Sequence, residues 1–178
     1  MRDAGLAQTG PGRVVFGGSV QRMLPTDASD LPCWVVHSDG SAQPNPGRMG
    51  LGAVLVAPDG SRQALSEAAP ERGCNNEAEL RALMAALQRL IAQGATAARL
   101  YSDNSILVEQ LRGAGDIPPV ARLAPLFDEA RALLAGLAHS SIHWVPRHRN
   151  AEADALARAA LGLAPKPTRK PGSARRRR

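Results

Sequence analysis

The segment Trp34–Gly47, WVVHSDGSAQPNPG, places a short apolar strand directly before a carboxylate and a turn of small residues and prolines. Asp39 follows the apolar residues, and Gly40, Ser41 and Ala42 come next. Because no bulky side chain stands there, a polyanionic ligand could approach the carboxylate and the backbone N–H groups beside it. A strand that ends in an Asx turn would produce the same pattern, so this segment alone leaves both interpretations open.

Composition predicts one domain with an extension at each end. The chain has 178 residues, 44% of them apolar and only 3% aromatic, so aliphatic side chains must build its core. We expect one folded domain over residues 31–163. Residues 1–30 show no clear periodicity and are interpreted as a flexible N-terminal extension. Residues 164–178, which hold seven Lys or Arg side chains and no acid, are interpreted as a disordered basic tail.

The cysteines and the apolar pattern argue against several classes of protein. Cys33 and Cys74 lie far apart and form no C-x-x-C pair, so we expect free thiols and neither a disulfide framework nor a zinc site. The sequence shows no apolar run of membrane-spanning length and no secretion signal. We therefore expect a cytoplasmic protein without a membrane partner, and we expect a monomer.

Periodicity and turn signals predict the order of the elements. Three strands come first, and the turn at Pro58–Gly60 lets the third return antiparallel to the second. Asn76 is expected to cap the helix that follows, with Glu79 three residues later. The expected strands are residues 33–38, residues 50–57, a third that ends near residue 67, residues 98–102 and residues 141–145. The expected helices run from residue 76 to about 93, from 104 to about 112, from about 120 to about 138, and from a cap at Asn150 to about 161.

This order predicts an α/β fold. Right-handed crossovers would place the last two strands parallel to the first. The result is a mixed five-stranded sheet, three antiparallel strands followed by two parallel ones, with helices on both faces. The first and fourth strands would be neighbours, and their carboxyl ends would share the edge at which open α/β sheets usually bind ligands.

Four acidic residues are expected to meet at this edge. Asp39 and Asp103 each follow one of the neighbouring strands, and Glu79 and Asp154 lie one turn into helices that begin near the same edge. Four acids at one place require a cation, and oxygen ligands favour Mg²⁺ or Mn²⁺. Local interpretations remain open for three of them. Glu79 could complete a capping box with Asn76, and Asp103 could cap the next helix. Asp154 could complement the dipole of the last helix.

Five motifs occur in order across residues 31–163: HSDGSAQPNPG, GLGAVLV, NNEAELRAL, LYSDNS and WVPRHRNAEADALA. Their combination resembles the type 1 ribonuclease H family over nearly the whole folded part. The resemblance implies a ribonuclease H-like fold and a hydrolase, an endonuclease that cuts the RNA strand of RNA–DNA hybrids. It implies two Mg²⁺ ions with substrate, or Mn²⁺, and products with a 5′-phosphate and a 3′-hydroxyl. It assigns catalysis and metal binding to Asp39, Glu79, Asp103 and Asp154.

The resemblance also implies contacts to the hybrid. Asn45, Asn75 and Asn76 match family positions that contact the hybrid in its minor groove. Amide groups can both donate to and accept from the 2′-OH, which distinguishes RNA from DNA. The other residues expected to bind substrate are Gly40, Ser41, Ala42 and Asn104.

His148 and the basic tail each have two interpretations. In many family members a mobile histidine before the last helix assists catalysis, and His148 lies six residues before Asp154. The alternative is a surface histidine between Arg147 and Arg149.

The segment Leu111–Pro125 holds no Trp or Lys, so the chain resembles the short form that lacks a basic protrusion. The tail is then expected to contact nucleic-acid phosphates, unless it is only a solvated extension.

Two other functions fit the same fold. A hybrid-binding module could keep the fold and be weakly active or inactive, although the intact set of four acids argues against this. An exonuclease or resolvase-like nuclease is the other, but an exonuclease would carry an Asp-x-Glu pair on the first strand. This chain has Asp39, Gly40 and Ser41 there.

Overall fold

The computed structural model describes residues 32–113 and 121–166. The predictions for residues 1–30 and for most of the tail, residues 167–178, lie outside the described residues. Within them, Cys33 and Cys74 are free thiols, as predicted. No helix in the two described ranges is long and apolar enough to cross a bilayer.

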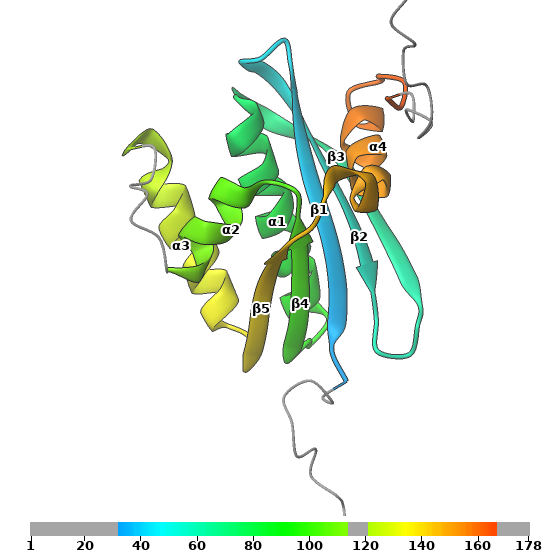
Figure 1. Cartoon of the computed structure of the whole chain (residues 1–178), viewed down its shortest axis with the longest axis vertical. Coiled ribbons are helices and arrows are strands. Elements are labelled where there is room, and N and C mark those ends of the chain that lie inside the picture. The colour runs from blue at the N-terminus through cyan, green and yellow to red at the C-terminus, as the bar shows by residue number, and fades with distance from the viewer. Residues whose placement is uncertain (1–31, 114–120, 167–178) are drawn as a thin grey trace, which may run out of the picture. The chain divides into compact units, whose positions relative to one another are not determined.

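The predicted mixed five-stranded sheet is confirmed, with the strand order β3-β2-β1-β4-β5. The pairs β1–β2 and β2–β3 are antiparallel, and β1–β4 and β4–β5 are parallel (Figure 1). The strands are β1 (Trp34–Gln43), β2 (Gly47–Val56), β3 (Arg62–Gly73), β4 (Ala97–Ser102) and β5 (His139–Trp144). The helices are α1 (Asn75–Ala92), α2 (Ser105–Arg112), α3 (Ala124–Ala135) and α4 (Ala151–Ala159), with 3₁₀ turns η2 (Ala121–Leu123) and η3 (Arg147–Arg149).

Helices cover both faces of the sheet, and alternate residues of β2 show how. Leu51, Ala53 and Leu55 belong to the core cluster under α1, whereas Gly50 and Gly52 lie against the backbone of α4. Since successive side chains of a strand point to opposite faces, α1 and α4 pack on opposite sides of β2. Both faces being covered explains why β2 is a nearly continuous apolar run.

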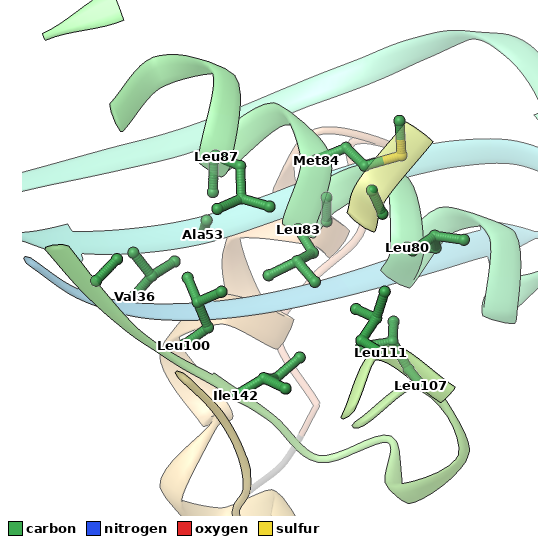
Figure 2. Packing of buried hydrophobic residues seen from close by; sticks show 14 of the residues in the cluster. Val36, Ala53, Leu80, Leu83, Met84, Leu87, Leu100, Leu107, Leu111 and Ile142 are labelled. Carbon is green, nitrogen blue, oxygen red and sulfur yellow. The ribbon is translucent and has the colours of Figure 1, made fainter. Parts of the chain in front are cut away.

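The main core lies between α1 and the sheet (Figure 2). Leu80, Leu83 and Leu87 recur at spacings of three and four and are fully buried. They pack in one cluster with Val36 of β1 and Leu100 of β4. Burying each such side chain contributes about 1.5–3 kcal/mol to folding, so this stripe holds α1 against the two central strands.

β1 is longer than predicted and carries Asp39 inside the strand, not at its end. Antiparallel pairing with β2 continues to Gln43, which lies opposite Arg48. The parallel pairing with β4 stops at His37, opposite Tyr101. Asp39 therefore lies within the β1–β2 hairpin but just past the last paired residue of β4. β3 also exceeds its prediction, because its pairing with β2 continues as far as Gly73.

Several predicted helix boundaries are wrong. Cys74, and not Asn76, is the N-cap of α1, and no side chain caps this helix. α3 begins at Ala124, four residues later than predicted, with Pro125 in its first turn. Proline has no N–H to donate and is accommodated best where a helix begins, since the first N–H groups have no intrahelical acceptor. The end of α4 at Ala159 agrees with the predicted end near residue 161.

The variant Gly52→Ala is expected to loosen α4. A Cβ at this position would lie 2.3 Å from the Ala153 carbonyl oxygen and 2.3 Å from the Ala157 nitrogen, so the helix would have to move. We expect a loss of about 1–3 kcal/mol in the free energy of unfolding, measured by urea denaturation. Ala68→Val enlarges an exposed side chain on the neighbouring strand and serves as the control. Equal losses in the two variants would contradict this account of the packing.

Candidate active site

Asp39 is 5% exposed, and its Oδ1 accepts a hydrogen bond from the Gly40 nitrogen at 2.9 Å. Gly40 leaves no room for a side chain: a Cβ there would lie 2.1 Å from the Ala78 carbonyl carbon and 2.2 Å from the Glu79 nitrogen. The backbone of α1 therefore touches the backbone of β1 beside Asp39. This contact brings Glu79 to the buried carboxylate.

Asp103 directly follows β4 and is held by Asn150. The Asn150 Nδ2 donates to Asp103 Oδ1 at 2.7 Å and to the Ser38 carbonyl oxygen at 2.9 Å. Asn150 is 2% exposed, so these bonds form in a dry environment. The indole Nε1 of Trp144 donates to the Asp103 carbonyl oxygen at 3.1 Å. Asn150 stands at the N-cap of α4 as predicted, but its side chain makes no cap bond and instead ties α4 to β1 and to Asp103.

Glu79 is held near Asp103 by the side-chain amide of Asn104, the residue that follows Asp103. The Asn104 Nδ2 donates to Glu79 Oε2 at 2.5 Å, while the Asn104 Oδ1 accepts from the Leu107 nitrogen and caps α2. Two local interpretations are thereby wrong. Glu79 completes no capping box, because α1 begins before Asn76, and Asn104 caps α2 in place of Asp103.

Asp154 lies in the first turn of α4, where two cationic side chains meet it. The Arg147 Nη2 lies 3.3 Å from Asp154 Oδ1, and the Lys166 Nζ lies 2.5 Å from the same oxygen. The side chain of Asp154 is 11% exposed, whereas those of Arg147 and Lys166 are 66% and 43% exposed, so solvent screens both ion pairs on the cationic side. The helix-dipole interpretation fits the position of Asp154 but accounts for neither of the two ion pairs.

The four carboxylates influence one another. Burial, and then the charges of Asp103, Glu79 and Asp154, raise the pKa of Asp39 to about 8. Burial also raises the pKa of Glu79 to about 7, although the bond from Asn104 opposes this shift. For Asp154, burial acts to raise the pKa, but the hydrogen bond and charge of Lys166, with hydrogen bonds from Asp39 and Arg147, lower it overall. The site thus concentrates negative charge around Asp39.

This arrangement fits a hard divalent cation by its chemistry. The donor set consists of oxygen atoms only, which Mg²⁺ and Mn²⁺ prefer. Burial, and then the charges of the neighbouring carboxylates, raise the pKa of Asp39, so a bound cation would stabilise its ionised form. In the described ranges, no three His, Cys, Asp or Glu side chains are already gathered closely enough to hold a metal ion. Amides and cations of the chain occupy oxygens of Glu79, Asp103 and Asp154 instead.

Most residues predicted to bind substrate lie beside this cluster. Gly40, Ser41 and Ala42 continue β1 past Asp39, and Asn104 bonds to Glu79 as described above. The Asn75 Oδ1 accepts from the Ala42 nitrogen at 2.8 Å. The Asn75 nitrogen donates to the Asn45 Oδ1 at 3.1 Å. A chain of hydrogen bonds therefore joins the β1–β2 turn to the start of α1, where Asn76 is exposed in the first turn.

His148 and His143 lie in different surroundings. His148 is exposed on η3, between Arg147 and Arg149 and directly before α4. His143 is half-buried and lies on β5. Its Nε2 is 2.9 Å from the Ser141 Oγ, and its ring tilts against Tyr101 at 5.4 Å.

Without divalent cations, Asp39→Asn is expected to be more stable than the wild type at pH 8. Burial and neighbouring charges raise the pKa of Asp39 to about 8 from its ordinary value of 3.8. Between these values the folded state binds more protons than the unfolded state, so wild-type stability falls as the pH rises from about 4 to 8. The substitution removes this dependence, so the stability advantage of Asp39→Asn over the wild type is expected to grow from pH 5 to pH 8.

Urea unfolding in a chelator at pH 5 and pH 8 measures the effect. Asp59→Asn, at an exposed turn carboxylate that accepts from the Ser61 nitrogen, is the matched control. A pH dependence that survives unchanged in Asp39→Asn would contradict the assignment.

Known proteins share this fold. A family model described as reverse transcriptase-like matches residues 37–160. Ribonuclease HI of Halobacterium salinarum is 40% identical over 151 residues, which are 83% of this chain and 74% of that protein. The crystal structure of RNase H1 from the same archaeon has a TM-score of 0.68 at 37% identity, covering 72% of this chain and 97% of that one.

Two further proteins are similar over the same region. A bifunctional protein of Mycobacterium tuberculosis is 38% identical over 131 residues, 73% of this chain but only 36% of that much longer protein. The crystal structure of LC11-RNase H1 in complex with an RNA/DNA hybrid has a TM-score of 0.65 at 25% identity, covering 72% of this chain and 96% of that one. The sheet topology, the order of the motifs and these similarities together place the chain in the type 1 ribonuclease H family.

Proposed function

We propose that this protein is an endonuclease that hydrolyses the RNA strand of RNA–DNA hybrids with Mg²⁺ or Mn²⁺. One observation carries the proposal: the buried Asp39 lies under the electrostatic influence of Glu79, Asp103 and Asp154, on the fold of a ribonuclease H. The similar LC11-RNase H1 structure contains an RNA/DNA hybrid, which supports a hybrid as the class of substrate.

The four carboxylates would hold the metal, two ions when substrate is bound, with Asp39 the most buried of these ligands. Bound metal would activate the attacking water and offset charge at the scissile phosphate, leaving a 5′-phosphate and a 3′-hydroxyl. The chain's own amides orient two of the ligands: Asn104 positions Glu79, and Asn150 positions Asp103. These two asparagines act as positioning residues for the carboxylates.

Recognition of RNA would come from the amide chain beside the acids. Asn45, Asn75 and Asn76 lie at the start of α1 and in the adjoining turn, where they can meet the minor groove. Amide side chains and the exposed backbone around Ser41 can donate to and accept from a 2′-OH. The bond between Asn75 and the Ala42 nitrogen fixes this surface relative to Asp39.

Three parts of the proposal rest on the sequence. The arginine-rich tail would contact nucleic-acid phosphates and compensate for the absence of a basic protrusion in this short form. A monomeric state and a cytoplasmic location also stay predictions. The second candidate, a weakly active or inactive hybrid-binding module, would have the same fold without turnover.

Cleavage of a labelled RNA–DNA hybrid in Mg²⁺ and in Mn²⁺ tests the reaction. We expect the wild type to cut the RNA strand and to leave the DNA strand intact. Asp39→Asn is expected to lower turnover by a factor of at least about 10³, because it removes the central ligand. Asp59→Asn, on the exposed β2–β3 turn, is the control and should keep wild-type turnover.

The alternatives give different results in the same assay. Hybrid binding by the wild type without cleavage would favour the binding module. Preferential cutting of duplex DNA or of single strands would favour an exonuclease or a resolvase-like nuclease.

His148→Ala is expected to lower turnover about tenfold or more without weakening hybrid binding, as loss of a proton-transfer group would. The exposed position of His148 on η3, between the last strand and the helix that carries Asp154, leaves it accessible to substrate. His139→Ala, at an exposed histidine that starts β5, is the control. Undiminished turnover of His148→Ala at saturating metal would make this histidine a bystander.

A further inference from the structure

The chain reverses direction immediately after α4. The Leu163 nitrogen donates to the Arg158 carbonyl oxygen at 3.0 Å, and the Gly162 nitrogen donates to that of Ala159 at 2.9 Å. With Gly162 at φ +73°, these two bonds form a Schellman motif, which ends a helix and turns the chain back. The Arg158 Nε then donates to the Ala164 carbonyl oxygen at 2.7 Å. Residues 163–166 therefore return along α4 toward its first turn.

This return places an ammonium group among the acids. Lys166 Nζ lies 2.5 Å from Asp154 Oδ1, with the lysine side chain 43% exposed and the aspartate side chain 11% exposed. Its positive charge also reaches Glu79, since it acts to lower the pKa of that carboxyl group. Arg147 bonds to the same oxygen of Asp154 at a longer distance of 3.3 Å. Lys166 is thus the nearer of two protein cations on the outer side of the cluster.

We propose that Lys166 is a tethered competitor of the divalent cation: it occupies Asp154 in the free protein and must withdraw before a metal ion can use that carboxylate. An ammonium within hydrogen-bond distance of a ligand oxygen takes the place of a cation there and repels a second one. The segment after α4 is therefore autoinhibitory. This inference rests on the metal use put forward under the proposed function.

The basic residues after Lys166 provide a means of breaking its contact with Asp154. Arg169, Lys170 and the run Arg175–Arg178 follow within twelve residues. Phosphates of a bound nucleic acid attract such side chains. Binding of the tail to substrate would draw Lys166 away from Asp154. By linkage, substrate and metal would then favour each other's binding.

Calorimetric titration of the full chain with Mn²⁺ tests the competition directly. Lys166→Gln is expected to bind Mn²⁺ roughly tenfold more tightly than the wild type, within the usual range of coupling between sites. Lys166→Arg keeps the positive charge and should stay within a factor of about two to three of the wild type. Lys170→Gln removes the same charge from the same segment and is the matched control, with wild-type affinity expected.

Each result has a distinct meaning. Equal affinity of Lys166→Gln and the wild type would overturn the competition and leave the proposed function intact. Equal tightening in Lys166→Gln and Lys170→Gln would also overturn it, because net charge and not the contact with Asp154 would be responsible. Absence of Mn²⁺ binding in all the variants and in the wild type would overturn both this inference and the metal use on which it rests.

Chemical labelling gives a second readout that needs no variant and no activity. Acetylation of lysines by a small anhydride, followed by mass spectrometry, reports how accessible each amine is. Saturating Mn²⁺ is expected to raise the labelling rate of Lys166 severalfold relative to that of Lys170, because the metal displaces the ammonium from Asp154. An unchanged ratio of the two rates at saturating Mn²⁺ would overturn the proposal.

Discussion

The contact of two backbones at Gly40 sets the geometry of the whole site. A side chain at this position would overlap the Ala78–Glu79 peptide, so the strand and the helix meet there without any atoms between them. The buried leucines of α1 begin at Leu80, directly after Glu79, and pack into the core. As a result, Asp39 is buried by the same packing that stabilises the fold, and Glu79 is its unavoidable neighbour. The acidic cluster is built into the main helix–sheet interface.

Gathering four carboxylates, two of them buried and two half-buried, has a cost, and the chain offsets it unevenly. Glu79 receives an amide from Asn104 and Asp103 receives one from Asn150, while Asp154 meets two cations. Asp39, at the centre, accepts the N–H of Gly40, and its pKa rises furthest, to about 8. The negative potential of the other three carboxylates thus acts most strongly at Asp39, where we propose that a metal ion binds. A site arranged in this way favours cation binding at the expense of stability in the absence of cations.

The sequence predicted the topology and the proximity of the four acids because both follow from short-range patterns. Strand and helix periodicity, with the handedness of crossovers, was sufficient to place β1 beside β4. Helix starts were predicted less well, because an asparagine before a helix is a cap signal whether or not its side chain is needed elsewhere. The position of Asn150 at a helix start was predicted correctly, but its bond to Ser38 was not, because that residue is 112 positions away and no local pattern encodes the contact.

The contact between Lys166 and Asp154 was not predicted, for a different reason. A lysine among prolines and arginines has the composition of a solvated tail, and such a pattern contains no information about which acid it meets. Lys166 meets Asp154 because the chain turns back at Gly162 and the Arg158 Nε bonds to the Ala164 carbonyl oxygen. Both features belong to the folded end of α4. In retrospect, the glycine after the last periodic residue of α4 was the signal that the chain turns back there.

The reversal at Gly162 also changes how the site responds to its surroundings. Four residues of tether keep the Lys166 ammonium close to Asp154, which corresponds to an effective concentration in about the millimolar range for a short linker. Dilution of the protein leaves that value unchanged, and so does removal of free cations from the solution. A longer or more flexible connection would lower it. The length of the segment between α4 and Lys166 is therefore a means by which the metal threshold of the protein could be set, independently of the ligands themselves.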